Sequence, residues 1–245
     1  MTNQMTTSFK LTIGAITLAA CTGLVAPKSA SAAIVTGTAN ISIDNTAFSS
    51  AANGWSISRF YDFNYNAEAI TASTAGGTTS TSNMVFPVNT NSSTTSYPGG
   101  VNRTLQATTM DAGNTASGQI GLSGALVMHH DILGNLMPYD LRLQKIAGTW
   151  NLITYDTSFQ GTTFLQLANA NESVNSNGQL SLSGDLIFGT GPGANAYPSI
   201  FNTTWGKFVG VAGAGQTAVV GSFNLTPAAV PVPAAVWMFG SGVRG

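Results

Sequence analysis

The stretch Gly118–Leu126 reads GQIGLSGAL, and Gly178–Leu186, sixty positions later, reads GQLSLSGDL. Side chains two residues apart lie on the same face of a β-strand, so the apolar residues at even-numbered positions predict strands with one buried face. A glycine interrupts each stretch at the same place, Gly124 and Gly184, where a missing side chain often marks a bulge or a close crossing of strands. The residues predicted to be buried are Ile120, Leu122, Leu126 and Met128 in the first stretch and Leu180, Leu182, Leu186 and Phe188 in the second.

The same two-residue alternation recurs along the chain, while helical periodicity is scarce. Further apolar positions that alternate in this way are Ile41, Ile43, Leu141, Leu143, Phe223 and Leu225. Tryptophans stand at the start of three expected strands, at Trp55, Trp150 and Trp205. Short strands separated by turn-forming residues are typical of an antiparallel sandwich. We therefore predict an all-β fold in which residues 33–227 form a single antiparallel β-sandwich, jelly-roll-like, with long loops rich in Ser, Thr, Gly and Asn.

The composition limits the chemistry that the chain is expected to perform. Only 7% of the 245 residues are charged and the formal net charge is -1. No basic surface is expected to neutralise phosphates, so we expect no nucleic-acid partner. The surface is expected to consist mainly of hydroxyl and amide groups. The single cysteine, Cys21, lies in the apolar N-terminal segment, so the rest of the chain has no thiol for a disulfide or a zinc site.

Residues 1–32 have the organisation of a secretory signal peptide. A lysine and an apolar run are followed by Ala30 and Ala32, which place small residues at the -3 and -1 positions of a cleavage site before Ala33. We expect recognition by the export machinery and cleavage after Ala32. An alternative is that Leu18–Cys21, which reads LAAC, is a bacterial lipobox. Cys21 would then be acylated and would anchor the mature chain to a lipid surface.

The C-terminal segment 230–242 reads VPVPAAVWMFGSG. It resembles the PEP-CTERM sorting signal of exported Gram-negative proteins, in which a Val-Pro-x-Pro motif precedes a membrane helix and an arginine-rich tail. The resemblance implies processing by an exosortase-type cysteine peptidase and residence in a polysaccharide matrix. The prolines favour an extended, accessible segment. The residues that carry the resemblance are Val230, Pro231, Val232, Pro233 and Ala234.

This segment departs from the family pattern in length. The apolar stretch 234–243 has about half of the roughly 20 residues that a membrane helix needs. Arg244 is the only basic residue that follows it. We therefore expect residues 228–245 to be a truncated sorting signal that provides no stable transmembrane anchor.

No constellation of reactive residues stands out, so we expect no catalytic residues, no cofactor and no metal. The only histidines, His129 and His130, are adjacent. Adjacent side chains of a strand face opposite ways, which disfavours joint chelation outside a turn. The glycine-rich runs 213–218 and 189–193 loosely match nucleotide-binding fingerprints. The first precedes a strand pattern and the second lacks the Lys-Ser/Thr pair, so we expect a hairpin turn and a loop.

Acidic residues leave two alternatives open. A calcium site could use Asp111 with Asn114, or Asp185, although the spacing of an EF-hand is missing. A glycosidase would need two carboxylates across a cleft, and the sequence does not give their separation. Candidates for such a pair are Asp62, Glu68 and Asp156.

Aromatic residues offer a binding surface without catalysis. Tyr97 and Tyr197 stand next to prolines and are expected to be exposed, where their rings could stack on sugars. Further candidates for the same platform are Tyr61, Tyr65, Tyr155 and Trp150. Together these features predict an exported, non-catalytic protein of the cell surface or extracellular matrix, associated with exopolysaccharide or biofilm. The alternatives are a carbohydrate-binding module that uses the two tyrosines, and a secreted hydrolase.

Overall fold

The computed structural model describes residues 33–61, 78–96, 102–136, 138, 140–154, 161–190 and 210–229. The chain divides into two units, Met1–Ala30 and Ser31–Gly245, and every described residue belongs to the second. Both terminal signals lie outside the described residues, apart from Ala33 and the positions 228 and 229. Tyr97 and Tyr197 lie outside them as well.

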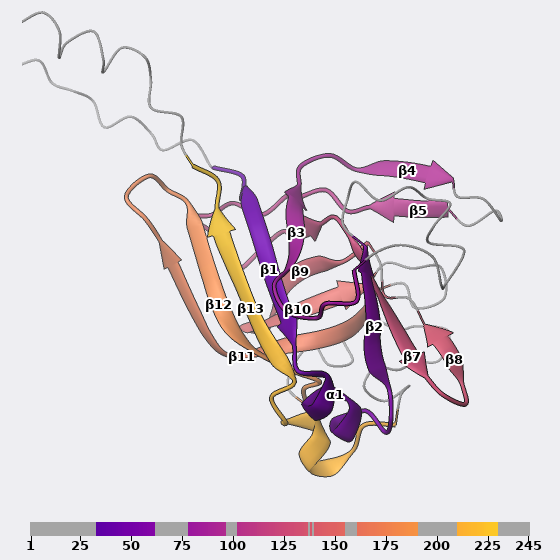
Figure 1. Ribbon diagram of the computed structural model, residues 1–245. Helices are drawn as coiled ribbons and strands as arrows, with labels where there is room; N and C mark the ends of the chain where they lie inside the picture. Colours follow the sequence, from indigo (N-terminus) through magenta and orange to yellow (C-terminus); the bar gives the residue numbers. More distant parts are fainter. Residues whose placement is uncertain are drawn as a thin grey trace, which may run out of the picture. The chain divides into compact units, whose positions relative to one another are not determined.

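The main sheet is a closed antiparallel barrel, drawn in Figure 1. Each strand pairs with the next in the ring, and the last pairs with the first. The ring consists, in order, of β1 (Gly37–Ile43), β13 (Gly221–Pro227), β12 (Leu180–Ile187), β11 (Thr162–Val174), β10 (Thr149–Thr154), β9 (Arg142–Ile146), β6 (Ile120–Leu122) and β3 (Met84–Asn89).

The prediction of a jelly-roll-like sandwich is therefore wrong, although the all-β class is right. Pairing of Ala39 in β1 with Phe86 in β3, and of Ile120 in β6 with Leu143 in β9, joins edges that a sandwich leaves open. Barrels and sandwiches share the same alternation of inward and outward residues along each strand. Alternation alone could not distinguish them.

Five further strands and two short helices accompany the barrel. The strands form a sheet of β2 (Ser56–Tyr61), β7 (Ala125–His130) and β8 (Gly134–Leu136), and a hairpin of β4 (Ser93–Ser96) and β5 (Asn102–Leu105). The helix α1 (Asn45–Ala51) begins where Asp44 accepts hydrogen bonds from the backbone N–H groups of Thr46 and Ala47. A 3-10 helix, η1 (Gly213–Gln216), contacts α1.

The two repeated stretches form core strands, as predicted. All eight even-numbered apolar residues are at most 1% exposed. The copies nevertheless differ, because the chain leaves β6 in the barrel, passes Gly124 and enters β7 in the second sheet, whereas β12 runs through Gly184 without a break. Gly124 has φ 150°, and a Cβ there would lie 2.7 Å from the ring of Phe86. The sequence left a bulge and a close crossing open here, and the structure shows a close approach of the Phe86 ring.

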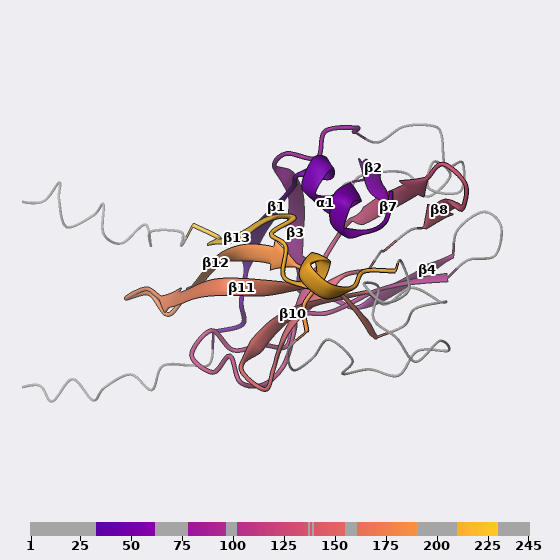
Figure 2. The same cartoon turned by 90° about the horizontal axis from the view of Figure 1, so that it is seen from below.

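Side chains fill the barrel, as expected for eight strands. Trp150 and Trp55 are buried, at 1% and 3% exposure, while Trp205 lies outside the described residues. Phe48 of α1 packs at the end of the barrel where β1 finishes, with ring centroids 5.0 Å from Phe188 and 6.5 Å from Phe164. Figure 2 views this end from below, with α1 and η1 in front of the strands.

Candidate functional site

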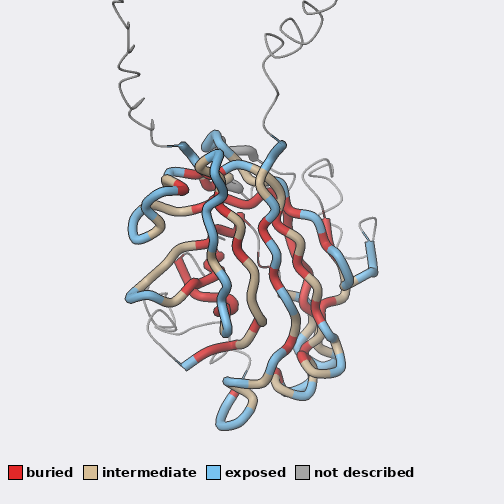
Figure 3. The backbone as a smooth tube through the Cα atoms, turned by 90° about the vertical axis from the view of Figure 1, so that its left-hand side faces the viewer, coloured by how far each residue is buried: buried red, intermediate tan, exposed pale blue. Residues whose placement is uncertain are grey.

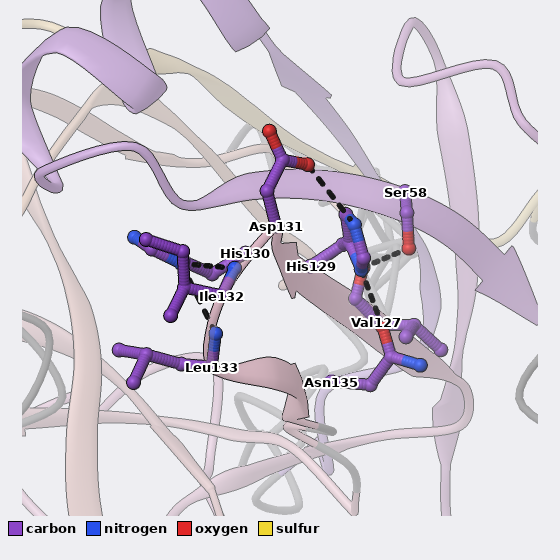
Figure 4. A network of polar contacts seen from close by, with 8 residues as sticks. All are labelled: Ser58, Val127, His129, His130, Asp131, Ile132, Leu133 and Asn135. Carbon is purple, nitrogen blue, oxygen red and sulfur yellow. Dashed lines mark hydrogen bonds and ion pairs between the residues drawn. The ribbon is translucent and has the colours of Figure 1, made fainter.

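Both histidines are the last two residues of β7 and directly precede the turn to β8 (Figure 4). The Nδ1 atom of His129 lies 2.9 Å from Oδ1 of Asn135, an amide oxygen that accepts a hydrogen bond. Its Nε2 atom lies 3.3 Å from the Asp131 carboxylate, whose side chain is 99% exposed. The contact between His129 and Asn135 joins β7 to β8 on the solvent side of the hairpin.

His130 has a different role in the same turn. Its Nδ1 atom accepts hydrogen bonds from the backbone N–H groups of Ile132 and Leu133, at 3.1 and 3.3 Å. Its ring centroid lies 5.3 Å from that of Trp55. The lone pair of His130 Nδ1, which could otherwise bind a metal, therefore accepts the hydrogen bonds that close the turn. Within the described ranges, no group of three His, Cys, Asp or Glu side chains is arranged to hold a metal ion.

The tip of this turn is apolar and solvent-exposed. Ile132 is 87% and Leu133 68% exposed, the two highest values among the large hydrophobic residues that the structure describes. The His130 hydrogen bonds to their backbone hold this tip in place. Sequence reasoning disfavoured a metal site at the histidines but did not foresee the hydrogen bonds that His130 accepts from this turn.

A cluster of side chains around one carboxylate, that of Glu172, lies at the other end of the barrel from α1. Glu172 of β11 accepts hydrogen bonds from Lys145 Nζ at 2.7 Å, Thr115 Oγ1 at 2.5 Å and Trp150 Nε1 at 3.1 Å. Lys145 and Trp150 are cross-strand partners in β9 and β10, and the Lys145 ammonium lies 5.5 Å from the Trp150 ring centroid. Three distant segments therefore meet at one side chain.

This environment fixes the charge of Glu172. Partial burial acts to raise the pKa of the carboxyl, but the hydrogen bonds from Lys145, Thr115 and Trp150 outweigh it and hold the pKa below its ordinary value. An acid or base in catalysis needs a pKa near the working pH. The cluster instead suits a permanent anion that ties the loop containing Thr115 to the barrel.

The third candidate is a polar surface on the outside of β1, β13, β12 and β11. Asn224 pairs with Asn40 on one side and with Ser183 on the other, and Ser183 pairs with Asn171. Ser42, Ser222 and Asp185 form a second cross-strand row. We call these seven residues the amide–hydroxyl face. Their neighbours along the strands point inward and are buried, among them Ile41, Leu182, Phe223 and Leu225.

The amide–hydroxyl face carries a single ionisable group. The Asp185 carboxylate accepts a hydrogen bond of 2.8 Å from Asn169 Nδ2. Figure 3 looks at this side of the barrel and shows exposed and buried residues alternating along it. On the opposite side of the ring the outward residues Arg142 and Asn151 are buried. Asp185 is thus the one ionisable residue among the seven residues of the amide–hydroxyl face.

The remaining sequence candidates lie apart from these three sites. Residues 213–216 form η1, so the predicted hairpin turn is a 3-10 helix. Asp111 accepts a hydrogen bond from the backbone N–H of Gly113 within a turn. Tyr61 and Trp150 are buried at 0% and 1% exposure, so neither is available to stack on a sugar. Outside the described residues lie Asp62, Glu68, Asp156, Tyr65, Tyr97, Tyr155 and Tyr197.

No helix in the described part of the chain has the length and apolar character needed to cross a membrane. Comparison with known proteins finds no matching family, no matching curated protein and no matching solved structure.

Proposed function

We propose that the chain is an exported, non-catalytic protein of the cell surface or extracellular matrix that associates with exopolysaccharide. The amide–hydroxyl face carries this proposal. It is a surface of half-buried to exposed hydrogen-bonding groups with one ionisable residue, on a barrel whose interior is occupied by side chains. A matrix protein needs an outer surface that contacts the polysaccharide, and it needs no internal cavity for a substrate.

The polar groups of the other two sites have structural partners, which favours a non-catalytic role. Glu172 accepts three hydrogen bonds, and the Nδ1 atom of His130 accepts two. A general base must be free to take a proton from a substrate. Neither group has that freedom, so the described residues offer no candidate base at these positions.

The terminal segments support export. We propose that residues 1–32 are a signal peptide cleaved before Ala33, because the small residues Ala30 and Ala32 stand at the -3 and -1 positions of the cleavage site. Acylation of Cys21 is the alternative. The segment from Val230 to Ala234 would direct the exported chain to an exosortase-type peptidase. The partners of the chain would then be the export machinery and that peptidase.

Cell fractionation tests the proposal directly. Cells producing the full chain are separated into cytoplasm, membranes, periplasm and medium, the chain is detected with an antibody, and its N-terminus is read by mass spectrometry. We expect a mature chain beginning at Ala33 outside the cytoplasm. Replacement of Ala32 by Phe should block cleavage, while replacement of Cys21 by Ser should leave it unchanged.

Two results would contradict the proposal. A chain that stays in the cytoplasm with residues 1–32 intact is not exported. A chain that begins with a lipid-modified Cys21, and that Cys21→Ser releases from the membrane, would replace the signal-peptidase model by the lipoprotein alternative.

A further inference from the structure

The amide–hydroxyl face is a regular grid. Neighbouring strands of a sheet lie about 4.8 Å apart, and residues that share a face recur about every 6.7 Å along a strand. Asn40, Asn224, Ser183 and Asn171 form one row across four strands, and Ser42, Ser222 and Asp185 form the next. Side chains on such a grid can contact several units of an extended polymer at once.

The groups in the first row are available to a ligand. The side chains of Asn40, Asn224 and Asn171 make no hydrogen bond to the part of the chain that the structure describes, and neither does the hydroxyl of Ser183. In the second row, Ser42 accepts a hydrogen bond from the backbone N–H of Asn83 at 2.8 Å. An amide offers two donors and an acceptor, and a hydroxyl offers one donor and two acceptor lone pairs. The row can therefore satisfy donors and acceptors alike.

An apolar border adjoins the grid. Val85 and Pro87 of β3 are the cross-strand partners of Asn40 and Thr38 in β1. Both are exposed, Val85 at 39%. A surface with apolar C–H groups beside amides and hydroxyls matches a sugar ring, which has a C–H face and hydroxyl groups at its rim.

The near absence of charge on the face restricts the class of polymer that it can bind. Asp185 is its single ionisable residue, and Asn169 hydrogen-bonds that carboxylate. An anionic polymer would find no cation on the face, and a cationic polymer would find one carboxylate already bonded. Neutral hydroxyl-rich chains are the chemistry that such a surface complements.

We propose that the amide–hydroxyl face, with Val85 and Pro87 at its border, binds a neutral polysaccharide. This inference deepens the proposed function and rests on it. Each exposed hydrogen bond contributes little, so binding depends on several rows engaging one chain together. A monosaccharide should therefore bind far more weakly than the polymer.

Affinity electrophoresis of the purified mature chain tests this site. Gels contain dextran, mannan, galactomannan or xylan as neutral polymers, or alginate as an anionic one. We expect retardation by at least one neutral polymer and none by alginate. A variant with Asn40→Ala, Asn171→Ala and Asn224→Ala should bind that polymer roughly ten-fold more weakly. The matched control carries alanine at Thr90, Ser176 and Asn177, which are exposed but lie outside the face. It should bind the polymer as the parent does.

Several results would overturn the inference. They are migration unchanged by all four neutral polymers, equal retardation by alginate, and full binding by the triple variant when its thermal unfolding matches the parent. Binding that survives the triple variant and is lost with Tyr97→Ala and Tyr197→Ala would assign the site to the tyrosines instead. Export is measured separately by fractionation, so a chain that binds in vitro but stays in the cytoplasm contradicts the proposed function and leaves the binding site standing.

Discussion

Lys145 and Glu172 form an ion pair of 2.7 Å although their strands, β9 and β11, are separated by β10. The pair lies beside Trp150 of β10, which donates its indole N–H to the same carboxylate. Both charged side chains are about one-quarter exposed, at 25% and 26%. This contact links three strands and the Thr115 loop, and it makes the stability of the barrel depend on one ionised group.

We expect Glu172→Gln to remove part of the acid sensitivity of folding. The pKa of Glu172 is lowered in the folded chain from an ordinary value of 4.5. A carboxyl with a lowered pKa stabilises the fold fully above its unfolded pKa, and this contribution is lost as the pH falls through the folded pKa. The variant should therefore be less stable than the parent at pH 7, and the difference should shrink below about pH 4.5. Urea unfolding at several pH values measures it, and parallel profiles for the two proteins would contradict this account.

Thr115→Val should weaken the attachment of its loop to the barrel. The substitution keeps the side-chain volume and removes the hydroxyl that donates to Glu172. We expect a loss of about 1 kcal/mol in the free energy of unfolding. Thr90→Val, at an exposed position, is the control and should change stability by less than about 0.5 kcal/mol. Equal stability of both variants would show that the Thr115 hydrogen bond contributes nothing.

Replacement of His130 by Ala should open the β7–β8 turn locally. The backbone N–H groups of Ile132 and Leu133 lose their shared acceptor, and Trp55 loses its ring contact. We expect faster hydrogen exchange at these two amides, with a loss of global stability of roughly 1 kcal/mol or less. His129→Ala is the matched control, because His129 accepts from neither amide. Unchanged exchange in the His130 variant would contradict the assigned role.

Gly124→Ala should destabilise the fold. The new Cβ would meet the buried Phe86 ring at 2.7 Å, at a residue with φ 150°. Overpacking and backbone strain together are expected to cost roughly 2–5 kcal/mol. Gly134→Ala is the control, since its φ is 82° but nothing lies within 4 Å of the new Cβ. It should lose only the backbone contribution, about 1 kcal/mol. Equal unfolding midpoints for the two variants would mean that the Phe86 ring moves aside freely.

Much of the strand pattern could be predicted from the sequence, because burial on one face imposes a period of two. Leu122 and Leu182 were placed correctly in the core for that reason. The closure of the sheet could not be predicted. It depends on which edges pair, such as Ala39 with Phe86, and the alternation within each strand is the same whichever partner it finds.

The candidate sites were less accessible to sequence reasoning. Glu172 gathers donors from Thr115, Lys145 and Trp150, and no fixed spacing connects these positions. The amide–hydroxyl face could have been suspected from the polar residues between Ile41 and Ile43 and around Phe223. Its width across four strands follows only from the register of the sheet.

The pairing of Gly37 with Pro227 brings the beginning of β1 next to the end of β13. Tension applied between these two positions would pull at right angles to the strands, along the direction of the hydrogen bonds that join them. The β1–β13 ladder would then break one rung at a time, starting from Gly37 and Pro227, so this junction should yield to small mechanical forces. Strands sheared along their length, such as β11 against β12 in their long hairpin, would resist far larger ones.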